Sequence, residues 1–210
     1  MHEANSNETP AGFAQGSLQD FIQALSAKAP TPGGGSVAAL AGALAAAQLL
    51  MVIEYSVGKR SLAPHQPQLE DARSKMKRAA SLFLEFLEED AAAYEGLSAM
   101  LKLPADERYK QGNYAASITA AIRIPQAVAA LANQILSECL ALSGKTNALL
   151  ESDLWVAADM AAASGQAAIR NVYVNLPLVQ DADDRQREGD ATAELAAHRS
   201  RLIASIKAPG

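Results

Sequence analysis

The sequence predicts an all-α protein, an alanine-rich bundle of several helices that forms a single domain. Of the 210 residues, 46 are alanine, which is the best helix former and is depleted in strands. Apolar residues recur at a helical period along most of the chain, and no linker is long enough to separate two domains. Only 5% of the residues are aromatic, so cohesion must come from the close approach of helices rather than from large side chains.

The first two expected helices are separated by a turn rich in proline and glycine. Residues 17–28 carry apolar side chains at a helical period, and Ser17 is expected to be the N-cap of this helix. The turn PTPGGG at residues 30–35 ends it, and Ser36 is expected to cap a second helix that runs towards Gly58. Three small residues spaced four apart on that helix are expected to form a face that another backbone approaches: Ala38, Gly42 and Ala46.

Five further helices are expected, the first of them long. Residues 69–101 carry apolar side chains at seven-residue steps, after a turn around Pro64 and Pro67 and before a polar connection at 104–112. The other expected helices cover residues 113–124, 125–142, 152–175 and, after an acidic loop at 177–189, residues 191–206.

Composition excludes several classes of protein. A net charge of −5 argues against a general nucleic-acid binder. The single cysteine, Cys139, excludes a disulfide framework and fits a reducing compartment, so a cytoplasmic location is expected. Three histidines and one cysteine leave little for a metal site. No histidine is placed to activate a serine or Cys139, so covalent catalysis is disfavoured.

No segment is expected to enter a membrane. Residues 1–16 are polar, lack the pattern of a signal peptide and are expected to be a disordered lead-in to a helical domain at 17–207. Residues 36–53 are uncharged over eighteen positions, which is long enough for a membrane span. Alanine and glycine dominate this stretch, and Glu54 and Lys59 follow closely, so a buried core helix is the expectation.

The turn TPGGGS at residues 31–36 is the first candidate site. Its three glycines free the backbone to turn amides towards a ligand, and the start of a helix carries unpaired N–H groups and a positive dipole end. Such a site suits a carboxylate or a phosphate. The turn lacks the ending of a nucleotide P-loop, and an ordinary glycine-containing loop is the alternative.

Asp90 is the second candidate, because seven-residue steps from Leu69 place it on the inward stripe of its helix. A carboxylate in that position must be paired or hydrogen-bonded, or it will hold a proton near neutrality. Either state suits a general acid/base or a ligand anchor. An Asp that only bonds a neighbouring helix end is the alternative.

Four polar residues near the two ends of the mostly apolar segment 152–175 are further candidates. Ser152 or Asp153 could simply cap this helix, although Asp153 shares a face with apolar residues and could point at the core. Asn171 and Asn175 need partners if they are buried, and amides suit the edge of a heterocycle. Satisfaction of helix ends is the competing explanation.

A basic cluster is a candidate site for an anionic tail, with a solvated helix face as the alternative. It contains Lys59, Arg60, Arg73, Lys75, Lys77 and Arg78.

With these motifs, the chain resembles the cyclodeaminase/cyclohydrolase family of folate enzymes. That family includes the C-terminal domain of formiminotransferase-cyclodeaminase and stand-alone methenyltetrahydrofolate cyclohydrolases. The block PTPGGGS heading an alanine-rich helix is the most specific part of the resemblance. The matching blocks lie in order at residues 21–47, 57–60 (VGKR), 88–94 (EEDAAAY), 152–158 (SDLWVAA) and 171–176 (NVYVNL).

The resemblance implies an all-helical homodimer that binds a folate near the subunit interface, with no metal or redox cofactor. It implies that Asp90 is the acid/base or stabilises a cationic carbon, and that Asp153 orients the pterin or water, with exchange of these two roles left open. Lys59 would aid proton transfer or hold a glutamate carboxylate. The implied substrate-binding residues are Pro32, Gly33, Gly34, Gly35, Ser36, Ser152, Asn171 and Asn175.

The activity implied first is formiminotetrahydrofolate cyclodeaminase, which releases ammonia and forms 5,10-methenyltetrahydrofolate. The alternatives are 5,10-methenyltetrahydrofolate cyclohydrolase, which gives 10-formyltetrahydrofolate, and a folate-binding helical dimer without catalysis. Polyglutamylated folates are candidate ligands. The chain departs from the family pattern at Lys145, where asparagine is common after glycine, and at Tyr94, where phenylalanine is common.

Overall fold

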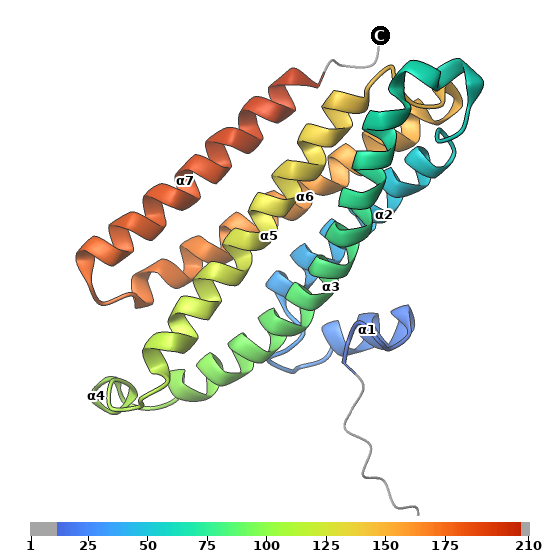
Figure 1. The fold of residues 1–210 in the computed structure, drawn as a ribbon. Coiled ribbons are helices and arrows are strands. Elements are labelled where there is room, and N and C mark those ends of the chain that lie inside the picture. Colours follow the sequence, from blue (N-terminus) through green and yellow to red (C-terminus); the bar gives the residue numbers. More distant parts are fainter. Residues whose placement is uncertain (1–11, 207–210) are drawn as a thin grey trace, which may run out of the picture.

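The computed structural model describes residues 12–206, and each regular element in that range is a helix (Figure 1). The predicted all-α fold is thereby confirmed for the described part of the chain. In chain order the elements are α1 (Leu18–Leu25), α2 (Gly34–Glu54), η1 (Arg60–His65), α3 (Gln66–Leu101), α4 (Ala105–Arg108), α5 (Tyr114–Leu142), η2 (Ala148–Leu150), α6 (Glu151–Asn175), η3 (Leu176–Leu178) and α7 (Ala182–Ser205).

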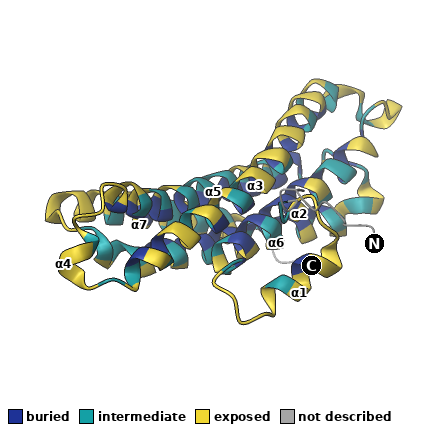
Figure 2. Ribbon diagram, turned by 90° about the horizontal axis from the view of Figure 1, so that it is seen from below, coloured by how far each residue is buried: buried dark blue, intermediate teal, exposed yellow. Residues whose placement is uncertain are grey.

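Four long helices form a bundle around the main core. α2 packs against α3 and α6, and α5 packs against the same two helices. α7 lies along α5 and α6, and Phe21 of the short α1 joins the core. α1 and α7 are mostly exposed, whereas the four bundle helices turn their buried residues inwards (Figure 2).

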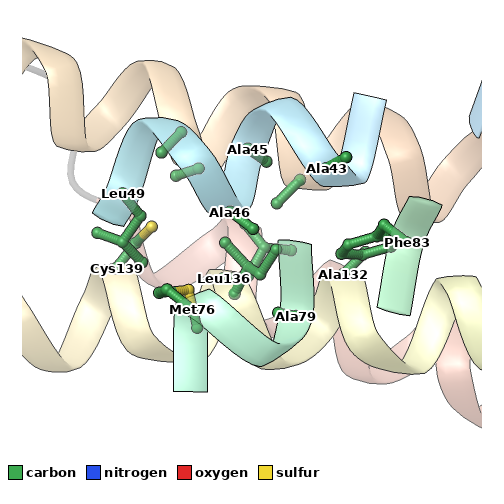
Figure 3. Packing of buried hydrophobic residues seen from close by; sticks show 14 of the residues in the cluster. Ala43, Ala45, Ala46, Leu49, Met76, Ala79, Phe83, Ala132, Leu136 and Cys139 are labelled. Atoms are coloured by element: carbon green, nitrogen blue, oxygen red, sulfur yellow. The ribbon is translucent and has the colours of Figure 1, made fainter. Parts of the chain in front are cut away.

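Small residues let α2 approach its neighbours closely. Ala39, Ala45 and Ala46 are fully buried. Figure 3 shows Ala45 and Ala46 in a core that they share with larger side chains of α3 and α5. A Cβ atom on Gly42 would lie 2.3 Å from Phe83 Cε1. The expected small-residue face therefore receives the aromatic ring of Phe83 rather than a bare backbone.

α5 is one continuous helix where the sequence predicts two. Pro125 lacks a backbone N–H, so the carbonyl of Ala121, four residues earlier, loses its usual partner within the helix. Asn175 Nδ2 of α6 donates a hydrogen bond to that carbonyl oxygen at 2.9 Å. A side chain from α6 replaces the missing bond, and the prediction of separate helices at 113–124 and 125–142 is wrong.

α7 begins inside the segment 177–189 that the sequence predicts to be a loop. Asp181 caps the helix, because its carboxylate accepts a hydrogen bond from the Asp184 N–H at 2.8 Å. Asp183 and Asp184 lie in the first turn, where negative charge interacts favourably with the helix dipole. The acidic residues therefore mark a helix start, and the loop prediction is wrong from residue 182 onwards.

α2 and α5 are both long and apolar enough to cross a membrane by length and composition alone. Core helices pass the same test, and 56% and 44% of the two apolar windows are buried inside the bundle. α2 supplies a large share of the main core, as predicted for residues 36–53.

Residues 1–11 of the expected disordered lead-in lie outside the described residues. Residues 12–16 contact the bundle: Phe13 meets Phe21 edge-on with 6.2 Å between ring centroids, and the Ala14 N–H donates to Glu88 Oε1 at 2.6 Å. The next residue, Ser17, forms a reciprocal capping box with Asp20 at the start of α1. The predicted cap at Ser17 is confirmed.

Candidate active site

The glycine turn leads into α2 three residues earlier than the sequence predicts. α2 begins at Gly34 with Gly33 as its N-cap, and Ser36 lies inside the first turn. Ser36 is fully buried, and its hydroxyl donates to Asp90 Oδ2 at 3.0 Å. The expectation that Ser36 caps the helix is wrong, because a glycine takes the cap position and the serine side chain turns towards α3.

Two glycines of the turn make room for polar side chains from other helices. A Cβ atom on Gly35 would lie 1.9 Å from Asp90 Oδ1, and one on Gly34 would lie 3.2 Å from Asn171 Oδ1. The Asp90 carboxylate therefore sits directly against the first turn of α2, where the positive end of the helix dipole stabilises negative charge. The start of α2 is thus occupied by a carboxylate of the protein itself.

Asp90 is half-buried, in agreement with its predicted place on the inward stripe of α3. Burial raises the pKa of its carboxyl above the usual value for aspartate, and the hydrogen bonds from the Ser36 hydroxyl and backbone amide act in the opposite direction without cancelling it. The carboxyl therefore holds its proton to a higher pH than an exposed aspartate does. This property suits proton transfer.

A cavity of about 270 Å³ opens where the start of α2, the middle of α3 and the end of α6 meet. Six of the predicted site residues line it: Gly33, Gly34, Gly35, Asp90, Asn171 and Asn175. Pro30, Tyr94 and Val174 complete the lining. Pro32, which is also part of the turn, is buried and does not line the cavity.

The two asparagines of the cavity differ in what they can offer a ligand. Asn175 already uses its amide nitrogen on the Ala121 carbonyl. The side-chain amide of Asn171 makes no hydrogen bond to any other described residue, so it can both donate to and accept from a ligand.

Tyr94 was missed as a site residue by the sequence reasoning, which noted it only as a departure from a family pattern. It follows Asp90 by four residues, a spacing that puts two side chains on one face of a helix. Its side chain is 43% exposed, and it is the aromatic residue of the cavity lining. The spacing from Asp90 was the signal that could have found it.

Three other predicted site residues lie at the opposite ends of α2 and α6. Asp153 accepts a hydrogen bond from Gln48 Nε2 at 2.8 Å. Ser152 is exposed beside it, and Lys59 is exposed just beyond the end of α2. Asp153 and Asn171 are eighteen residues apart on one helix, which corresponds to about 27 Å. Within one chain, the two predicted catalytic carboxylates therefore lie far apart.

Ion pairs neutralise much of the basic cluster. Arg73 contacts Glu54 and Glu70, and Lys77 also contacts Glu54. Lys75 contacts Asp71 and Glu138. These contacts favour an ion-paired helix surface over a site for an anionic tail.

A larger cavity of about 450 Å³ lies between α5 and α7 and contains none of the predicted site residues. Four of its charged side chains form ion pairs with one another, Arg123 with Glu188 and Arg187 with Asp184. The smaller cavity at Asp90 is therefore the better candidate for chemistry. Among the described residues, no cluster of His, Cys, Asp and Glu could hold a metal ion.

Several known proteins are similar to this chain over most of its length. The family model for formiminotransferase-cyclodeaminase matches residues 17–194. A methenyltetrahydrofolate cyclohydrolase of Methylorubrum extorquens is 28% identical over 90% of this chain and 95% of its own length. The formimidoyltransferase-cyclodeaminase of Sus scrofa is 30% identical over 91% of this chain, which spans 37% of that longer protein.

A solved structure has the same fold. The formiminotetrahydrofolate cyclodeaminase of Thermotoga maritima superposes with a TM-score of 0.84 at 25% sequence identity, over 92% of this chain and 94% of that one. The family match covers the glycine turn, Asp90, Asn171 and the distant Asp153 together. The chain belongs to the formiminotransferase-cyclodeaminase family.

Proposed function

We propose that this chain is a folate enzyme that acts at the one-carbon bridge between N5 and N10 of tetrahydrofolate, and that its reaction is the cyclodeamination of 5-formiminotetrahydrofolate. The observation that carries the proposal is the Asp90 carboxyl, which has a raised pKa and lines a cavity beside the free amide of Asn171. Membership of a family whose relatives are named for folate chemistry supports the choice of substrate.

In this reaction N10 attacks the carbon of the protonated formimino group on N5, and the C=N bond of that group becomes a single bond to an amino group. The Asp90 carboxylate takes the proton that N10 loses, and the carboxylic acid so formed gives a proton to the departing amino group. Ammonia leaves, and the ring closes as the methenyl cation, beside a carboxylate that stabilises its charge. One residue thus acts as base and then as acid, which requires a pKa near the working pH.

The second candidate is ring opening of 5,10-methenyltetrahydrofolate, which the match to the Methylorubrum cyclohydrolase over nearly its whole length favours. Water attacks the methenyl carbon, and Asp90 takes one of its protons. N5 then receives that proton from Asp90 as its bond to carbon breaks, the hydroxyl on the carbon passes its own proton to solvent water, and 10-formyltetrahydrofolate forms. The same carboxyl serves both reactions, because both pass through a tetrahedral centre on the same carbon.

The size and lining of the cavity support a division of labour among its residues. A volume of about 270 Å³ holds only part of a folate, so the rest of the ligand must extend across the protein surface. Asn171 is assigned to the hydrogen-bonding edge of the pterin, and the ring of Tyr94 to contact with its face.

We also propose that the chain is a homodimer formed through the outer sides of α2 and α6. These sides expose large apolar side chains, including Leu44 at 49%, Val156 at 48% and Val174 at 74%. α2 and α6 run in opposite directions, because Gly34 meets Asn171 whereas Gln48 bonds Asp153. A two-fold axis across the middle of this face would put the partner's Asp153 beside the Asp90 cavity.

The test is to incubate the purified protein with each substrate in turn. Release of ammonia from 5-formiminotetrahydrofolate supports cyclodeamination, and faster loss of the near-ultraviolet absorbance of 5,10-methenyltetrahydrofolate than in buffer supports ring opening. If the protein catalyses neither reaction but binds folate in calorimetry, the remaining interpretation is a folate-binding helical dimer without catalysis. Independence from cofactors, binding of polyglutamylated folates and a cytoplasmic location stay predictions from the sequence.

A further inference from the structure

The hydroxyl of Ser36 lies between two acceptors. Its oxygen is 3.0 Å from Asp90 Oδ2 and 3.4 Å from the backbone carbonyl oxygen of Leu87. A serine hydroxyl has one proton to donate and two lone pairs with which to accept. It therefore cannot make both bonds at full strength at the same time, and the protonation state of Asp90 decides which one it makes.

When Asp90 is ionised, its carboxylate is the stronger acceptor and receives the Ser36 proton. When Asp90 is protonated, its own O–H can donate to the Ser36 oxygen, and the serine proton can turn to the Leu87 carbonyl. Every polar group of the three has a partner in both states.

Ser36 cannot contact a substrate in this arrangement. It is fully buried, and it is absent from the residues that line the cavity. Asp90 lies between it and the cavity, with Oδ1 against Gly35 and Oδ2 against the serine.

We propose that Ser36 is a positioning residue that switches its hydroxyl between Asp90 and the Leu87 carbonyl, so that Asp90 keeps a hydrogen bond in both of its protonation states. This inference rests on the proposed function, in which Asp90 accepts a proton and returns it in each turnover. It replaces the expected role of Ser36 in substrate binding.

Few other charges act on Asp90. Tyr94 is the other titratable group that lines the cavity, and α6 contributes only uncharged residues to the lining, Asn171, Val174 and Asn175. Glu88 and Glu89 precede Asp90 on α3; Glu88 accepts a hydrogen bond from the Ala14 N–H, and Glu89 is exposed. The start of α2 brings glycines and Ser36 and no charged side chain. Ser36 is therefore the contact to change.

The test compares Ser36→Ala with Ser164→Ala. Ser164 is a matched control, because it is also fully buried and donates to the Ala38 carbonyl at 2.7 Å, away from the cavity. The titration of Asp90 is followed by carboxyl ¹³C NMR, with the signal assigned by its loss in Asp90→Asn. Loss of a donor disfavours the charged carboxylate, so Ser36→Ala is expected to raise the Asp90 midpoint by about one pH unit.

Turnover gives a second readout. Ser36→Ala is expected to lower kcat about tenfold and to shift the acid limb of the pH profile upwards, with KM within about twofold of the original. Ser36→Cys fills the same space with a weaker donor and is expected to shift the NMR midpoint by less than Ser36→Ala does. Ser164→Ala is expected to change neither the midpoint nor kcat.

An Asp90 midpoint that stays unchanged in both Ser36 variants, or that moves equally in Ser164→Ala, would overturn the proposal. The Asp90 titrations of the original protein and of each variant are measured without substrate. If the protein catalyses neither folate reaction, the Asp90 titration midpoint still tests the proposed role of Ser36. If the protein is active but the midpoint does not move in the Ser36 variants, only the proposed role of Ser36 is wrong.

Discussion

At the scale of single residues, the behaviour of Asp90 results from opposing influences on one carboxyl. Burial favours the protonated form, whereas the Ser36 hydroxyl and the start of α2 favour the ionised form. The pKa of Asp90 remains above the usual value for aspartate. A group balanced in this way changes its protonation state at little cost, which general acid–base catalysis requires.

Asp90→Asn should lower turnover about a hundredfold or more, because an amide cannot take up and return the proton. The measurement is kcat with whichever folate substrate the protein turns over. Glu89→Gln is the matched control, since Glu89 is the neighbouring acid and is exposed on the outer side of α3. Equal activity in the two variants would remove Asp90 from the mechanism.

The same variant should be more stable than the original protein at neutral pH. Because the folded protein raises the pKa of Asp90, ionisation of this group opposes folding. That penalty is absent below the usual pKa of aspartate and grows as the pH rises through the folded value. The Tm of Asp90→Asn, measured by calorimetry, should therefore exceed that of the original protein at pH 7 and lose this advantage at pH 3.5. A lower Tm at pH 7 would contradict the sign of the shift.

The glycines of the turn should respond very differently to the same small change. A Cβ atom at position 35 would overlap the Asp90 carboxylate, whereas one at position 33 has its nearest neighbour, the Pro30 carbonyl oxygen, at 3.9 Å. Gly35→Ala should cost about 1–3 kcal/mol of unfolding free energy, and Gly33→Ala should cost much less. Urea denaturation of the two variants checks this, and equal losses would mean that the carboxylate is free to move aside.

Sequence reasoning located Asp90 but not its partner. The seven-residue stripe of α3 was sufficient to place the aspartate inwards, since that pattern is local to one helix. The bond to Ser36 joins residues 54 positions apart and depends on where α2 begins, which only the packing of α2 on α3 decides. The family resemblance implies that Asp90 and Asp153 act on the same folate, and within one chain they lie at opposite ends of α2 and α6.

At the scale of elements, α5 shows why helix ends were harder to predict than helices. A proline inside an apolar helical pattern is a sound signal for a break, because it removes one hydrogen bond. The signal fails here because Asn175, 50 residues further on and in another helix, supplies the bond to the Ala121 carbonyl. The start of α7 was missed for a local reason, since its acidic first turn was interpreted as a loop.

This compensation can be measured with a double-mutant cycle. Asn175→Ala should cost about 1–3 kcal/mol of unfolding free energy, because it leaves the Ala121 carbonyl without a partner. In the Pro125→Ala background the helix N–H returns, and the same change should cost about 1 kcal/mol less. Denaturant titrations of the four proteins give the coupling. Strict additivity would show that the amide does not replace the missing bond.

At the scale of the whole molecule, the family match covers two groups of polar residues that one chain keeps apart. The group around Asp90 lies at one end of α2 and α6, and the group around Asp153 lies at the other. Both ends border the same pair of antiparallel helices, whose outer sides expose apolar residues such as Leu44 and Val156. An antiparallel dimer through these helices would build each site from both groups.

Mixing two inactive variants tests this arrangement directly. Asp90→Asn and Asp153→Asn should each be inactive alone, because every site in either homodimer lacks one carboxylate. After subunit exchange, half of the dimers contain one copy of each variant. In such a dimer one site has lost both carboxylates, and the other has kept both. The mixture should therefore recover about one quarter of the original activity.

The control for this experiment uses two changes at the same end of the helices. Asp90→Asn mixed with Asn171→Ala restores no intact site, because in every dimer each cavity carries one of the two changes. Its activity should stay at the level of the separate variants. Subunit exchange is verified by mass spectrometry of differently tagged subunits. Leu44→Glu puts a charge on the proposed interface, so it should yield monomers in sedimentation and abolish the recovery of activity. If neither mixture recovers activity although subunit exchange is verified, each site is built from one subunit and Asp153 acts elsewhere.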